Sequence, residues 1–128
     1  MDRTVVLDAP ALMALIRGEA GAEMVSESLS WAVVSAVNQA EVQARLVSAG
    51  LEKSLAWWHI AEVGCESVPF DEEQAQIAGG LPAVTRPYGL SLGDRACLAL
   101  AIQRGGTVYT TNRAWKSLPL DVRVEIIR

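Results

Sequence analysis

The fold is organised around one stretch, Ser91-Leu92-Gly93-Asp94-Arg95-Ala96-Cys97-Leu98-Ala99-Leu100-Ala101. Ser91 and Asp94 have the spacing of a capping box, in which a serine and an acid three residues later satisfy free N–H groups at the start of a helix. After Arg95 the stretch is small and apolar, which predicts a helix packed on several sides. Asp94 therefore lies at the mouth of a buried helix, either as a cap alone or as part of a polar site.

Short apolar segments alternate with helical segments along the rest of the chain. The predicted strands are residues 4–7, 31–34, 65–70 and 107–110, with an edge strand at 123–127. The predicted helices are residues 11–16, 22–29, 35–50, 51–63, one that begins at 71 and breaks at 79–82, one at 91–105 after a loop at 86–89, and a short one at 114–117. This alternation predicts an α/β fold with a largely parallel sheet and right-handed crossovers.

Four polar residues fall where such a sheet places its ligand site, at the carboxyl ends of the strands. Asp8 and Asn112 follow the first and fourth predicted strands. Glu41 and Asp94 lie near the starts of helices that rise from the same edge. Three carboxylates pushed together in a partly dry cleft repel one another, and proteins resolve this repulsion by raising a pKa, adding a basic partner or binding a cation.

A hard divalent cation suits this group of oxygen ligands. Mg²⁺ and Mn²⁺ favour carboxylates and water, whereas the two cysteines and His59 lack the spacing of a zinc site. A metal held by carboxylates stabilises charge on a phosphate and orients an attacking water. Hydrolysis of a phosphodiester is therefore the expected reaction, although composition alone does not separate it from other metal-assisted phosphate chemistry.

Length and composition set the broad class of protein. The 128 residues predict one domain spanning 1–128. A net charge of −4 argues against a protein that binds nucleic acid through bulk positive charge, but an acidic metal site fits it. Because no signal peptide or long apolar segment is present, we expect a cytoplasmic protein without a membrane partner. Cys65 and Cys97 are expected to be reduced, buried thiols.

Each of the four candidate residues lies within a short motif. The four motifs are, in chain order, Val5-Val6-Leu7-Asp8-Ala9, Val37-Asn38-Gln39-Ala40-Glu41-Val42, Leu90-Ser91-Leu92-Gly93-Asp94-Arg95-Ala96-Cys97 and Thr110-Thr111-Asn112-Arg113-Ala114-Trp115. They resemble the motifs of PIN-domain ribonucleases, most closely the VapC-type toxins of prokaryotic toxin–antitoxin pairs. The resemblance covers essentially the whole chain. It implies a PIN-like three-layer sandwich with a mostly parallel sheet of four to five strands flanked by helices.

The resemblance also implies an activity and its partners. A protein of this kind is a Mg²⁺- or Mn²⁺-dependent endoribonuclease that pairs as a homodimer and is inhibited by a VapB-type antitoxin. Carried over by position, Asp8, Glu41 and Asp94 are the catalytic, metal-binding acids, and Asn112 occupies the place of a fourth catalytic acid. Asn38, one turn before Glu41 on the same helix face, is expected to orient it.

Two departures from the family pattern support an alternative function. Asn112 replaces the usual aspartate, and Pro10 stands where a small hydroxyl residue follows the first acid. An amide carries no charge, so it binds a metal more weakly than a carboxylate. The alternative is a catalytically weakened PIN-like domain that binds RNA or an antitoxin without cleaving. A phospho-receiver domain ranks third, because the first strand offers only Asp8 and the one candidate lysine is Lys116.

Asp8, Glu41 and Asn112 also have simpler structural interpretations, as Asp94 does. Asp8 can cap the helix that begins near Pro10, and Glu41 can pair with Arg45 four residues later. Asn112 can serve as a turn or N-cap residue, for which asparagine is well suited.

Other polar and aromatic residues have open roles. Arg86, Arg95 and Arg113 lie near the predicted rim in sequence and either contact RNA phosphates or form ordinary surface interactions. Trp57 and Trp58 follow one another in the helix at 51–63. We expect at least one of them to pack in the core, the other interpretation being a surface for a partner.

Overall fold

The structure, a computed structural model, describes residues 3–128 and contains a five-stranded sheet. Its strands are β1 (Val5–Leu7), β2 (Ala32–Ser35), β3 (Glu66–Val68), β4 (Thr107–Thr110) and β5 (Arg123–Ile126). Their order is β3-β2-β1-β4-β5, and every neighbouring pair is parallel. In the central strand, Val6 lies opposite Val33 of β2 and Val108 of β4. The predicted α/β fold with a parallel sheet is confirmed.

Helices fill the connections between the strands. They are α1 (Ala9–Arg17), α2 (Ala22–Ser28), α3 (Ala36–Ser48), α4 (Lys53–Val63), α5 (Glu72–Gly80), α6 (Pro82–Thr85) and α7 (Leu92–Arg104), with short 3₁₀ helices η1 (Leu29–Trp31), η2 (Arg86–Tyr88) and η3 (Arg113–Ser117). The loop expected at 86–89 is thus a 3₁₀ turn. Within residues 3–128, none of the helices has the length and apolar character needed to cross a bilayer.

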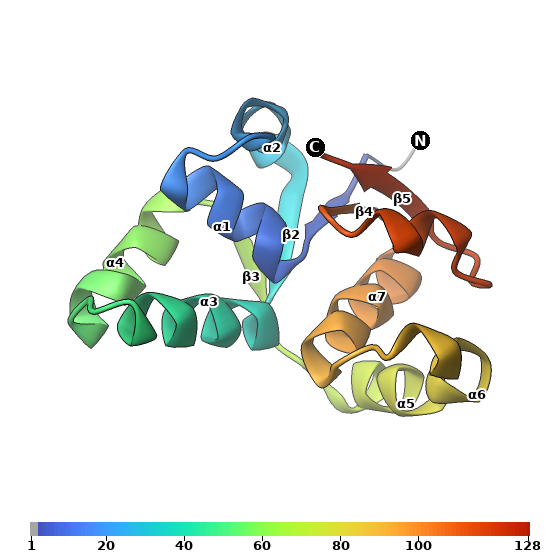
Figure 1. The fold of residues 1–128 in the computed structure, drawn as a ribbon. Coiled ribbons are helices and arrows are strands. Elements are labelled where there is room, and N and C mark those ends of the chain that lie inside the picture. Colours follow the sequence, from blue (N-terminus) through green and yellow to red (C-terminus); the bar gives the residue numbers. More distant parts are fainter. Residues whose placement is uncertain (1–2) are drawn as a thin grey trace.

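The sheet separates two apolar layers. Val6 belongs to one cluster with α7 residues such as Leu98, whereas its neighbours Val5 and Leu7 belong to another with Ala11 of α1. Successive side chains of a strand point to opposite faces, which explains this alternation. Helices α1 and α2 therefore cover one face and α7 the other, with α5 packed beside α7 (Figure 1). The result is the predicted three-layer sandwich.

The capping box predicted at the start of α7 is present. The Ser91 Oγ atom accepts a hydrogen bond of 3.1 Å from the N–H of Asp94, and the Ser91 N–H donates one of 2.9 Å to Asp94 Oδ2. The helix ends at Gly105, whose positive φ of 68° gives a left-handed cap. Residues 96–101 are all buried, so the expected packing on several sides is confirmed.

Helices α3 and α4, predicted at 35–50 and 51–63, pack against each other beyond one end of the sheet (Figure 1). Buried Ala56 and Ile60 form the inner face of α4. Trp57 and Trp58 lie on the other faces and are 43% and 53% exposed. The expectation that one of these tryptophans packs in the core is wrong, because Ala56 and Ile60 set the helix phase.

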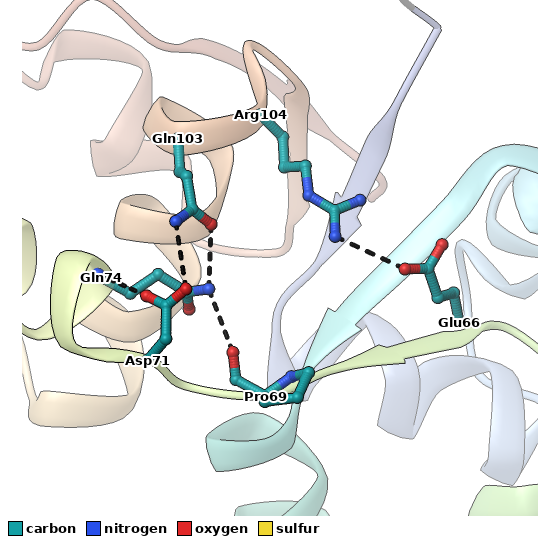
Figure 2. Close-up of polar contacts among 6 residues, drawn as sticks. All are labelled: Glu66, Pro69, Asp71, Gln74, Gln103 and Arg104. Carbon is teal, nitrogen blue, oxygen red and sulfur yellow. Dashed lines mark hydrogen bonds and ion pairs between the residues drawn. The ribbon is translucent and has the colours of Figure 1, made fainter.

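A polar network joins the start of α5 to the end of α7 (Figure 2). Asp71 caps α5 by accepting a hydrogen bond from the N–H of Gln74. The buried Gln74 side chain does not complete a capping box; it donates to Pro69 O at 3.1 Å and to Gln103 Oε1 at 2.9 Å. Gln103 in turn donates to the Asp71 carboxylate. This network holds the segment after β3 against α7, the helix that carries Asp94.

Candidate active site

Asp8 lies at the carboxyl end of β1, the central strand, and only 2% of it is exposed. It is the N-cap of α1, and its Oδ1 atom accepts a hydrogen bond of 2.8 Å from the N–H of Ala11. Pro10 follows within the first turn, where its missing N–H costs no hydrogen bond. The structural interpretation of Asp8 as a cap is therefore correct, and it leaves the carboxylate at the predicted edge of the sheet.

Thr110, at the carboxyl end of β4, holds the Asp8 carboxylate from the neighbouring strand. It is fully buried, and the interaction of its side chain with the Asp8 carboxylate lowers the pKa of that carboxyl group. The Thr110 Oγ1 atom accepts a hydrogen bond of 3.0 Å from the N–H of Asn112. We did not single out Thr110 from the sequence, although its place at the end of a predicted strand beside β1 is the signal that would have identified it.

Glu41 lies on α3, half-buried, and is held by Asn38 one turn earlier. The Asn38 Nδ2 group donates hydrogen bonds of 2.9 Å to Glu41 Oε1 and of 3.0 Å to the carbonyl oxygen of Gly93. Asn38 itself is 1% exposed. Residues 3–128 contain no ion pair between Glu41 and Arg45, so that structural alternative is not the one adopted.

Asp94 is half-buried in the first turn of α7 and takes part in the capping box with Ser91. Its Oδ2 atom is engaged by the Ser91 N–H. An acid in the first turn also interacts favourably with the helix dipole. The capping role of Asp94 is thus confirmed, and it fixes the carboxylate near the other acids.

The electrostatics show that the three acids converge. Burial, opposed by hydrogen bonds from Thr110 and Ala11, raises the pKa of Asp8 to about 7, and the charges of Asp94 and Glu41 add to this increase. The Cys97 thiol, fully buried in α7, has a pKa raised first by burial and then by the same three carboxylates. Residues from β1, α3 and α7 therefore share one electrostatic environment, as the sequence predicted.

The donor set fits a hard cation, although its side chains do not form a preassembled metal centre. Among residues 3–128, no three His, Cys, Asp or Glu side chains are arranged as a ready metal-binding group. Glu41 Oε2 and Asp94 Oδ1 accept no hydrogen bond from that part of the chain. The two ion pairs formed there join Arg104 to Glu66 and Arg128 to Glu19, so no basic side chain pairs with the converging acids. Uncompensated carboxylate oxygens are the ligands that Mg²⁺ and Mn²⁺ prefer.

Asn112 lies at the end of β4 but is exposed and acts as the N-cap of η3. Its Oδ1 atom accepts a hydrogen bond of 3.1 Å from the N–H of Ala114. The three arginines differ from one another: Arg95 donates to Ala78 O and so anchors α7 to α5, whereas Arg86 and Arg113 are exposed. Asn112 therefore lies beside Thr110 as the cap of η3 and adds no fourth charge.

A cavity of about 700 Å³ lies at the amino ends of β4 and β5, opposite the candidate site. Its lining includes Gly105 and Thr107, where α7 ends and β4 begins. None of the predicted site residues lines it. In open parallel sheets the carboxyl edge is the one that carries chemistry, so the converging acids define the candidate site.

A parallel open sheet with acids gathered at its carboxyl edge defines an α/β protein with an oxygen-rich, acidic site. The family model described as "PIN domain" matches residues 5–119. The chain therefore belongs to the PIN domain family, which the four sequence motifs had indicated. Among curated protein sequences, none matches this chain.

Solved structures share this fold over nearly their full lengths. VapBC2 from Rickettsia felis, bound to a DNA fragment from its promoter, aligns with a TM-score of 0.76 at 20% identity, covering 96% of this chain and 98% of that one. DNA-bound VapBC from Salmonella typhimurium gives 0.72 at 23% identity, covering 98% and 99%. VapBC-1 from nontypeable Haemophilus influenzae gives 0.74 at 16% identity, covering 97% and 98%. At these identities the likeness is one of fold.

Proposed function

We propose that this protein is a Mg²⁺- or Mn²⁺-dependent endoribonuclease and the toxin of a VapBC-type toxin–antitoxin pair. The observation that carries the proposal is the electrostatic coupling of Asp8, Glu41 and Asp94, which form no ion pair with a basic side chain of residues 3–128. Membership of the PIN domain family and the shared fold with VapBC structures support it. In this proposal residues 1–128 form a single PIN domain.

Each proposed ligand is held by a neighbouring group. Thr110 and the Ala11 N–H hold Asp8, Asn38 holds Glu41, and the capping box holds Asp94. When bound by the three carboxylates, the metal supplies Lewis-acid stabilisation of a phosphate and orients water. Burial of Asp8 removes that carboxylate from bulk water, which strengthens its interaction with a cation.

One observation favours the alternative function, a PIN-like domain that binds RNA or an antitoxin without cleaving. The Asn112 side chain adds no charge, and its oxygen is engaged in capping η3. An uncharged amide such as that of Asn112 attracts a metal ion less strongly than a carboxylate does. The alternative therefore predicts a protein that binds its partner while losing hydrolysis.

The proposal includes three partners and a location. RNA is the substrate, a VapB-type antitoxin is the inhibitor, and a second copy of the chain completes a homodimer in the cytoplasm. The solved VapBC structures support the antitoxin. A small gene immediately upstream of this one is the expected source of the antitoxin, and co-expression of the two products should yield a complex on gel filtration. A separate elution of both products would argue against that partner.

Titration with Mn²⁺ tests the proposed chemistry directly. Isothermal titration of Mn²⁺ into the wild type should show binding that Asp94→Asn abolishes, and RNA cleavage should be lost in the same variant. Asp71→Asn is a matched control, because Asp71 also caps a helix but lies outside the candidate site. Cleavage that survives Asp94→Asn would refute the assignment. A wild type that binds RNA or an antitoxin, but that does not bind Mn²⁺ and leaves RNA uncleaved, would favour the alternative.

A further inference from the structure

The Glu41 carboxylate lies against the backbone of Gly93, where α3 meets the first turn of α7. A Cβ atom at position 93 would overlap both carboxylate oxygens of Glu41. Gly93 is buried and is not among the glycines with positive φ. Its backbone conformation is therefore open to any residue, and the need for glycine comes from the space that Glu41 occupies.

Asn38 binds the two sides of this contact together. Its Nδ2 group donates to Glu41 Oε1 and to the carbonyl oxygen of Gly93, at 2.9 and 3.0 Å. Its Oδ1 atom is buried and has no hydrogen-bond partner within residues 3–128. A buried amide that leaves one atom unsatisfied carries a cost. The amide is thus oriented for the two acceptors at the α3–α7 contact.

We propose that Gly93 is a positioning residue, which together with Asn38 fixes the Glu41 carboxylate at the α3–α7 contact. The inference rests on the proposed function for its consequence, because there Glu41 binds the metal. Glycine is a poor helix former, and alanine in the same turn would favour the helix. An alanine at position 93 therefore strengthens the local helix while it displaces the acid.

Gly93→Ala tests this in two backgrounds, the wild type and Glu41→Ala, by urea unfolding with chelator present. The substitution should raise the urea midpoint less in the wild type, where it meets the carboxylate, than in Glu41→Ala, where that carboxylate is gone. Gly79→Ala is the matched control, because Gly79 lies in α5 and a Cβ there meets no atom within 4 Å. It should raise the midpoint equally in both backgrounds.

Binding of Mn²⁺ supplies the functional readout. Gly93→Ala should lower the Mn²⁺ affinity of the wild type by about 10-fold or more, the usual effect of disturbing a ligand's support, while Gly79→Ala should leave it unchanged. Asn38→Ala is the second variant, which preserves the space but removes the donor to Glu41, and it should also lower the affinity.

Two results would overturn the inference: an equal shift of the urea midpoint by Gly93→Ala in both backgrounds, or wild-type Mn²⁺ affinity in Gly93→Ala. A wild type that binds no Mn²⁺ would instead refute the nuclease proposal. The contact between Gly93 and Glu41 would then be judged from the unfolding comparison alone, so the two failures are distinguishable.

Discussion

The Oδ1 atom of Asp8 accepts a hydrogen bond of 2.8 Å from the backbone N–H of Ala11. One carboxylate therefore caps α1 and lies in the candidate site at the same time. The capping hydrogen bond favours the ionised form, as a bound metal would, whereas burial and the charges of Glu41 and Asp94 oppose it. This conflict gives Asp8 a protonation behaviour that experiments can follow.

Stability in chelator should fall as the pH rises from about 4 to about 7. The pKa of Asp8 is about 7 in the native protein, whereas the ordinary value of an aspartate is 3.8, so in this range the native state holds a proton that the unfolded state has lost. The free energy of unfolding should decrease by about 4 kcal/mol over the range. Asp8→Asn should remove this part of the pH dependence, because an amide does not titrate in this range. Asparagine is an equally good N-cap, so the start of α1 is kept. Urea unfolding from pH 4 to 8 measures it.

Binding of Mn²⁺ should release a proton from the wild type at pH 6.5. A metal ligand must be deprotonated, and the raised pKa of Asp8 leaves its carboxyl largely protonated at that pH. Titration calorimetry in two buffers with different ionisation enthalpies reports the number of protons released. The Asp8→Asn variant should show none, and identical apparent enthalpies for the wild type in both buffers would contradict the prediction.

Replacing Asn112 separates its capping role from any role in metal binding. Asn112→Ala should cost about 1 kcal/mol in the free energy of unfolding, because it removes the hydrogen bond to the Ala114 N–H. Asn112→Asp retains a good cap, so its stability should stay close to that of the wild type. If position 112 faces the metal, the added charge should raise the Mn²⁺ affinity. An unchanged affinity would restrict this residue to capping.

Two tryptophans test the packing of the apolar layers. Trp115 in η3 is 2% exposed and belongs to the cluster beneath α7. Trp115→Ala should destabilise the protein by about 3–5 kcal/mol, since it leaves a large cavity in the core. Trp58→Ala is the matched control, because Trp58 is 53% exposed and its loss should change stability by less than about 0.5 kcal/mol. Denaturant unfolding of both variants compares them.

Local chemistry made much of this molecule predictable. The strand segments, the capping box of Ser91 and Asp94, and the left-handed end of α7 at Gly105 follow from residue types over a few neighbouring positions. Trp57 and Trp58 were misjudged for the same reason. Their apolar character is local, but their burial depends on which face of α4 meets α3.

The sequence by itself determined the succession of strands and helices along the chain. It thereby also determined that Asp8, Glu41 and Asp94 lie at the carboxyl edge of the sheet. Only the tertiary structure decided the burial of Asp8, its support by Thr110 and the contact of Glu41 with Gly93. The first set depends on side-chain periodicity and capping, which act within a few residues. The second depends on desolvation and steric contact between β1, β4, α3 and α7, which arise only when distant segments pack together.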